Sequence, residues 1–144
     1  MHIALREARA AAARGEVPVG AVVTGPDGNI LAQAGNGVEA GHDPTAHAEI
    51  TALRMAAKKL EVSRLTDCDL YVTLEPCAMC AAAISMARIR RLYFGAYDPK
   101  GGAVEHGPRF FTQPTCHHAP EIIGGIEDQQ AGLLLKAFFQ KLRE

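Results

Sequence analysis

Apolar residues along the chain repeat in two ways, one typical of helices and one typical of strands. Helical apolar spacing, alanine-rich stretches and a capping signal predict four helices, over residues 2–14, 46–60, 78–87 and 128–142. Short runs rich in β-branched and aromatic residues predict five strands, at 17–23, 30–32, 69–74, 91–96 and 122–123. The turn sequence Gly-Pro-Asp-Gly-Asn at 25–29 joins the first two strands into a hairpin.

This order of elements favours an α/β protein with a mixed sheet that is covered by helices on both faces. A chain of 144 residues has the usual size of one domain, so we expect a single domain over residues 1–144. Two segments, 35–44 and about 97–120, are rich in glycine and polar residues and are expected to be loops. Loops as long as the second are commonly functional.

Composition narrows the class of protein further. Hydrophobic residues make up 48% of the chain and charged residues 22%, which excludes a disordered or fibrous protein. No apolar run approaches the roughly 18 residues of a membrane helix, and the first 16 residues carry charge throughout, so we expect a cytoplasmic protein.

The net charge of −1 gives no sign of a nucleic-acid partner, so any RNA surface must be local. The segment 83–113 holds five basic and two acidic residues. Its arginines, Arg88, Arg90 and Arg91, fit phosphate contacts and a solvated helix–strand junction equally well.

The four cysteines suit metal binding or burial better than disulfides, because no secretion signal precedes them. Cys77 and Cys80 form a Cys-x-x-Cys pair, which alone fits a redox pair, a metal clip or coincidence. Cys68 and Cys116 lack such a context and are expected not to be ligands.

The sequence His-Ala-Glu at 47–49 decides between these alternatives. Asp43 or Thr45 is the expected cap of the helix at 46–60, which places His47 in its first turn, and Cys77 and Cys80 begin the helix at 78–87. One imidazole and two thiolates are three good ligands for one Zn²⁺ per chain, and the fourth position stays free for a water that zinc makes acidic.

Glu49 lies two residues beyond His47, about 200° around a regular helix, so we expect it to transfer protons and not to bind the metal. A general base so placed takes a proton from the water and returns protons to the substrate. The joint pattern H-x-E with P-C-x-x-C is the signature of zinc-dependent nucleobase deaminases.

With these motifs the chain resembles the cytidine deaminase superfamily, and within it the bacterial tRNA-specific adenosine deaminases. The resemblance covers GEVPVGAVV, DPTAHAEI, LYVTLEPCAMC, ARIRRLYFGAYDPKGG and LLLKAFFQKLR, at 15–23, 43–50, 70–80, 87–102 and 133–143. It implies a three-layer α/β/α cytidine deaminase-like fold, with a five-stranded mixed sheet between helices, and a homodimer whose active sites lie near the interface. The implied activity is hydrolytic deamination of adenosine to inosine at the wobble position of a tRNA anticodon loop.

Carried over residue by residue, the resemblance makes His47, Cys77 and Cys80 the zinc ligands and Glu49 the proton shuttle. The substrate contacts that it implies are Asn36, the Ala48 backbone N–H, Asp98, Lys100, Phe138 and Phe139. Each has a plainer alternative: Asn36 can stabilise its loop, Asp98 and Lys100 can form a turn, and one of the two phenylalanines is expected in the core.

Two rival functions remain open. A free-base guanine or cytosine deaminase shares the zinc motifs, but TLEPCAMC followed by GAYDPKGG resembles the tRNA branch. A catalytically silent RNA-binding protein that keeps zinc for folding has no need of Glu49. The chain departs from the family's pattern at His117-His118, where the family often has Asn-His, and at its C-terminal end, which is less basic than the family's usual tail. Both differences affect only expected RNA contacts.

Overall fold

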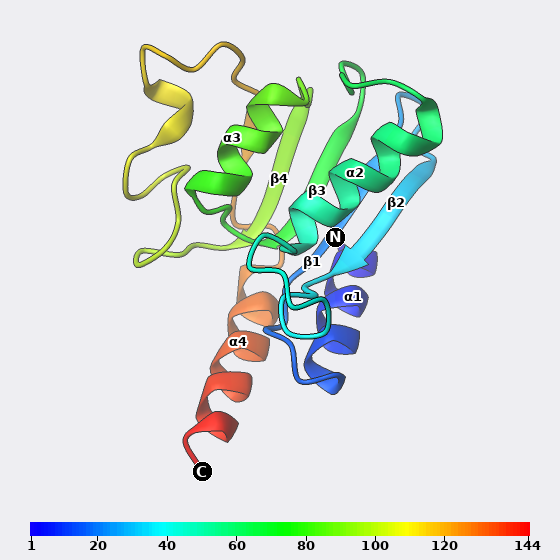
Figure 1. Cartoon of the computed structure of the whole chain (residues 1–144). Coiled ribbons are helices and arrows are strands. Elements are labelled where there is room, and N and C mark those ends of the chain that lie inside the picture. The colour runs from blue at the N-terminus through cyan, green and yellow to red at the C-terminus, as the bar shows by residue number, and fades with distance from the viewer.

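The computed structural model describes all residues 1–144 and contains one five-stranded sheet between two pairs of helices (Figure 1). In chain order the elements are α1 (His2–Ala13), β1 (Gly20–Thr24), β2 (Ile30–Gly35), α2 (Ala48–Leu60), β3 (Asp69–Leu74), α3 (Ala78–Met86), β4 (Arg91–Ala96), a 3₁₀ turn (Phe110–Thr112), β5 (Glu121–Ile123) and α4 (Asp128–Leu142). All predicted helices and strands are present, with shifts of a few residues at their ends. None of the helices is both long and apolar enough to cross a membrane.

The sheet is mixed, in the order β2-β1-β3-β4-β5. Strand β1 pairs antiparallel with both β2 and β3, whereas β4 pairs parallel with both β3 and β5. Helices α2 and α3 cover one face and α1 and α4 the other, which confirms the three-layer α/β/α expectation (Figure 1). The main core lies between the sheet and α2 and α3, around fully buried side chains such as Leu70, Ile84 and Phe94.

The parallel pairing of β3 and β4 matters for function. Two parallel strands are joined by a crossover helix, and this helix begins at the carboxyl end of the first strand. The crossover helix here is α3, which begins right after the segment Glu75–Cys77. The sheet therefore fixes where the Cys-x-x-Cys pair lies.

Helix α2 begins two residues later than predicted. Asp43 does not cap it: its carboxylate accepts hydrogen bonds from the Thr45 N–H at 2.9 Å and hydroxyl at 2.7 Å, which makes a local turn. His47 is the N-cap residue, with extended backbone angles of φ −65° and ψ 151°. The sequence predicts His47 in the first turn of the helix, but the residue lies just before that turn.

Two of the three arginines that were candidates for RNA contact are held in ion pairs. Arg90 forms two bonds of 3.0 Å to Asp69, and Arg91 lies 3.1 Å from Glu121. The structure thus favours the plainer alternative for this pair, a helix–strand junction that balances its own charge.

Helix α1 lies against β1 so closely that only glycine fits at Gly20. A Cβ atom there would lie 2.0 Å from the Ala4 carbonyl oxygen and 2.7 Å from the Ala8 nitrogen, both of which are backbone atoms. The backbones of the helix and the strand are therefore in direct contact at this point, with no side chain between them.

We expect Gly20→Ala to lower the free energy of unfolding by about 2–3 kcal/mol, because helix α1 must move away from the sheet. The matched control is Gly132→Ala in α4, where nothing lies within 4 Å of the added atom, and it should raise stability by about 0.5–1 kcal/mol. Urea unfolding followed by circular dichroism measures both. Equal stabilities for Gly20→Ala and the parent protein would contradict the close packing.

Candidate active site

The three predicted metal ligands meet at the neighbouring N-termini of α2 and α3. His47 and Cys77 are the N-cap residues of the two helices, and Cys80 lies in the first turn of α3. Extended backbone at both N-caps turns these side chains out of the helical path and toward one another. One nitrogen and two sulfur atoms consequently lie within 4.8 Å of one another.

The spacing of the donor atoms suits a zinc ion. The His47 Nδ1 atom lies 3.6 Å from the Cys77 sulfur and 3.5 Å from the Cys80 sulfur. Zinc bonds of about 2.3 Å to sulfur and about 2.05 Å to nitrogen, at a tetrahedral angle, place the two donors about 3.6 Å apart. The side chains therefore have the separation that a shared tetrahedral ion requires.

Charge also favours a cation between the two thiols. The hydrogen bond from the Cys80 thiol lowers the pKa of Cys77 to about 5 and raises that of Cys80. A divalent ion supplies the positive charge that lets both sulfurs ionise.

Glu49 stands beside this cluster but is not one of its donors. It lies in the first turn of α2, is 4% exposed, and lines the same cavity as His47 and Cys77. Burial raises the pKa of this carboxyl group above its ordinary value. A carboxyl group that is buried beside a metal site and open to the cavity is well placed to exchange protons.

A cavity of about 520 Å³ opens over the cluster. Its walls come from four parts of the chain: the segment after α1, the loop after β2, the ends of β3 and β4 with their loops, and the last turns of α4. The lining residues are Gly15, Glu16, Val17, Val19, Asn36, Val38, Glu39, His47, Glu49, Leu74, Glu75, Cys77, Asp98, Gly101, Phe138, Phe139 and Leu142. No lysine or arginine is among them.

Four of the six predicted substrate contacts line the cavity, and Ala48 and Lys100 do not. Asn36, Asp98, Phe138 and Phe139 line the cavity. Ala48 is fully buried as the first residue of α2, where a backbone N–H has no acceptor within the helix.

Lys100 does not line the cavity. It lies on the turn beyond Asp98, whose Oδ1 accepts the Lys100 N–H at 3.2 Å and the Gly101 N–H at 3.0 Å. Asp98 therefore forms the expected turn and also faces the cavity.

The expectation that one phenylalanine of α4 belongs to the core is wrong. Phe138 is half-buried and Phe139 is 42% exposed, with the two rings edge-to-face at 5.4 Å. The reason is that the last turns of α4 extend beyond the sheet, so no core lies beneath them (Figure 1).

Two buried cavity residues, Glu16 and Glu75, received no role from the sequence. Both stand inside recognised motifs, GEVPVG and TLEPC, but a glutamate in a loop reads as a solvated residue when its backbone partners are unknown. Cys68 and Cys116 are outside the donor cluster, as expected.

Comparison with known proteins agrees with this geometry. A model of the cytidine and deoxycytidylate deaminase zinc-binding region matches residues 1–96. The chain belongs to the cytidine and deoxycytidylate deaminase family. The His/Cys/Cys cluster of this deaminase is accordingly a zinc site that takes one ion per chain.

Similar proteins include a tRNA-specific adenosine deaminase of Agrobacterium fabrum, which is 57% identical over 99% of this chain and 93% of its own length. A structure from work on A-to-I editing by tRNA:A34 deaminases at the wobble position has 58% identity and a TM-score of 0.92, covering 94% of this chain and 97% of its own. A guanine deaminase from Nitrosomonas europaea is more distant, with 27% identity and a TM-score of 0.80 over 95% of this chain and 81% of its own.

We expect His47→Ala to lose nearly all of its zinc, because two cysteines alone leave the ion with half of a tetrahedral set. Glu49→Gln is the matched control on the same helix turn and should keep one zinc per chain. Metal analysis of the purified proteins by mass spectrometry measures both. Loss of zinc from Glu49→Gln would overturn the assignment of Glu49 as a non-ligand.

Proposed function

We propose that this deaminase converts adenosine to inosine at the wobble position of a tRNA anticodon loop, with release of ammonia. The observation that carries the proposal is the similarity over the full chain to tRNA-specific adenosine deaminases, together with an open cavity above the zinc site. An unpaired loop base costs less to turn out of its stack than a base in a duplex, so the reaction suits an anticodon loop.

We assign zinc binding to His47, Cys77 and Cys80. When bound, zinc acts as a Lewis acid that makes a water molecule reactive near neutral pH. The three ligands leave one side of the site open toward the cavity, where the adenine ring must enter.

We assign proton transfer to Glu49. Its carboxylate takes a proton from the attacking water as the new bond forms at C6 of adenine. The same group delivers that proton to ring nitrogen N1. It then takes the remaining proton of the new C6 hydroxyl as the C6=O bond forms and passes it to the amino group, so that the C6–N bond breaks and ammonia leaves. Burial suits this cycle because it lessens the difference in stability between the charged and neutral forms of Glu49.

The remaining substrate contacts follow from where the side chains lie. Asn36 is 7% exposed and faces the cavity, where its amide offers both a donor and an acceptor to a base edge. We assign the Ala48 N–H to the purine, and Phe138 and Phe139 to neighbouring bases, because exposed aromatic rings stack on unpaired nucleotides. Asp98 and Lys100, on the loop after β4, are also assigned to the RNA.

We also infer a homodimer in the cytoplasm, where tRNA is available. A second hollow of about 470 Å³ lies between α2 and α3, next to the helices that carry the zinc ligands. Its floor is apolar, and Met86 at its edge is 71% exposed. A second copy of the chain on this face would bring the two active sites near the interface.

We expect the zinc-loaded protein to form inosine in a wobble-adenosine anticodon stem-loop and to leave guanine, cytosine and cytidine unchanged. A stem-loop with its only adenosine moved one position away is the matched control and should not react. Glu49→Gln should reduce turnover by about 10²–10⁴-fold. Chromatography of the nucleosides and ammonia release measure the reaction, and turnover of guanine instead would favour the free-base alternative.

We expect Met86→Asp to convert the dimer to a monomer, because a charge would be buried against the apolar face of the partner. Leu133→Asp is the matched control: Leu133 is 65% exposed but lies on α4, on the opposite side of the sheet. Sedimentation velocity gives the masses. A Met86→Asp variant that stays dimeric would place the interface elsewhere.

A further inference from the structure

The two loops that border the cavity are each attached to a buried glutamate. One loop, residues 36–43, follows β2 and carries Asn36; the other, residues 97–106, follows β4 and carries Asp98. Glu16 and Glu75 are 1% and 2% exposed, and neither has a lysine or arginine partner. Buried carboxylates without such partners need other donors to offset the loss of water.

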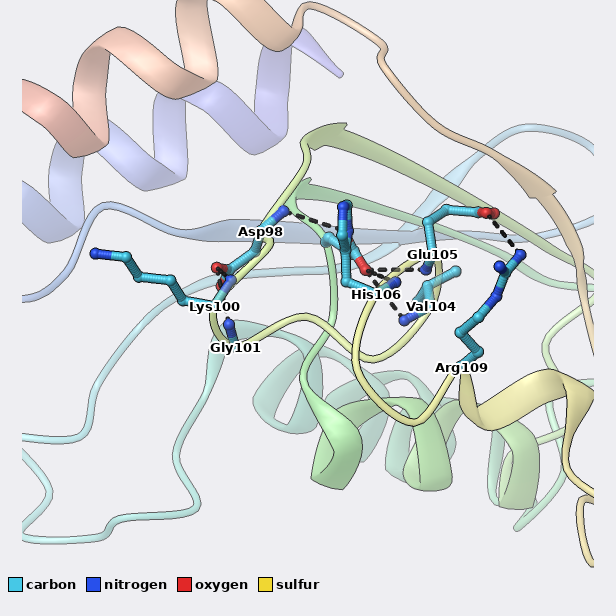
Figure 2. Close-up of polar contacts among 8 residues, drawn as sticks. Asp98, Lys100, Gly101, Val104, Glu105, His106 and Arg109 are labelled. Atoms are coloured by element: carbon cyan, nitrogen blue, oxygen red, sulfur yellow. Dashed lines mark hydrogen bonds and ion pairs between the residues drawn. The ribbon is translucent and has the colours of Figure 1, made fainter.

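Glu75 receives its donors from the loop after β4. Its Oε1 atom accepts the Asp98 N–H at 3.0 Å and lies 2.8 Å from the His106 Nδ1 atom. Its Oε2 atom accepts three successive backbone N–H groups, from Val104, Glu105 and His106, at 3.1, 2.9 and 3.2 Å. Figure 2 shows these loop residues gathered around one point, with Asp98 on one side and Val104 to His106 on the other.

The loop also lies in direct contact with the carboxylate. A Cβ atom on Gly102 would lie 2.5 Å from the Glu75 Cδ and Oε2 atoms and from the Asp98 carbonyl oxygen, so only glycine allows this approach. The Ala103 N–H donates to the Pro76 carbonyl at 2.8 Å, which ties the same loop to the segment leading into Cys77. The wall of the cavity is thus built around Glu75.

Glu16 does the same for the other wall. It follows α1, and its Oε1 and Oε2 atoms accept the Glu39 and Ala40 N–H groups, each at 2.9 Å. The Asn36 N–H, at the start of that loop, donates to the Val19 carbonyl at 3.0 Å. Asn36 is consequently held between β1 and a loop whose far side is attached to Glu16.

We propose that Glu16 and Glu75 are positioning residues for the RNA substrate, which hold the two loops apart at the width that admits a turned-out nucleotide. The identity of the substrate rests on the proposed function. Both glutamates act through backbone N–H groups of the loops and not on the reacting atoms.

A carboxylate is needed because every group that faces it is a donor. Two oxygens supply about four acceptor sites, and their charge strengthens each bond from a backbone N–H. Glutamine has the same shape but replaces one oxygen with an NH₂ group, which would face backbone N–H groups. The loop concerned then loses some of its hydrogen bonds to the glutamate position, while the zinc ligands stay in place.

We expect Glu75→Gln and Glu16→Gln each to raise KM for the anticodon stem-loop by about tenfold or more, with kcat changed less than about threefold. Both variants should keep one zinc per chain. Backbone hydrogen exchange should quicken at 98–106 in Glu75→Gln only, and at 39–40 in Glu16→Gln only, which separates the two anchors.

Glu105→Gln is the matched control for charge. Its side chain is exposed and forms an ion pair with Arg109 at 3.5 Å, and the substitution keeps the backbone N–H that Glu75 binds, so KM, kcat and exchange should stay unchanged. Gly102→Ala disturbs the contact between the loop and the Glu75 carboxylate while Glu75 itself is unchanged. It should reproduce the rise in KM, and the double variant with Glu75→Gln should be no worse than about the larger single effect.

Loss of zinc, or a lower kcat at an unchanged KM, would show that Glu75 acts on the metal centre and would overturn the proposal. Unchanged exchange at 98–106 in both Glu75→Gln and Gly102→Ala would overturn it as well. A parent enzyme that turns over guanine instead of the stem-loop would refute the proposed function. The anchors are then judged by exchange and by KM for guanine, where the same rise supports them.

Discussion

The structure depends on the meeting of two helix N-termini at one edge of the sheet. The side chains of His47, Cys77 and Cys80 converge there because both N-cap residues have extended backbone. In a continuous helix, His47 and Glu49 would point about 200° apart, and only one of them would reach the cavity. The late start of α2 removes this conflict, so one short segment supplies a ligand and a carboxylate to the same space.

Charge around the cavity constrains what can enter it. Glu16, Glu39, Glu49, Glu75 and Asp98 line the cavity, and no lysine or arginine does. A phosphate group inside would face this negative field, whereas a neutral base would carry no charge for the field to repel. The arrangement agrees with a substrate whose base enters the cavity while its phosphates stay outside.

The sequence predicted the order of elements and the three side chains that meet in the His/Cys/Cys cluster because both depend on local patterns. Helical spacing, alanine-rich stretches and runs of β-branched and aromatic residues marked the helices and strands, and the His47 and Cys77 motifs carry their chemistry in nearby residues. The wrong or missing details depend on distant contacts. Whether Phe138 is core depends on where the sheet ends beneath α4, and whether Arg90 is free depends on Asp69 in a neighbouring strand.

The roles of Glu16 and Glu75 were hidden for the same reason, because their partners are backbone N–H groups, which no residue type reveals. Each carboxylate replaces lost water with hydrogen bonds from a loop, and in the loop after β4 the neighbouring Val104 side chain also packs in the main core. Because the buried acceptor binds backbone N–H groups, the loop side chains that face neither the core nor the cavity are free to differ. The sheet thus sets the metal site, while two hydrogen-bonded anchors set the opening above it, so chemistry and substrate choice can change separately.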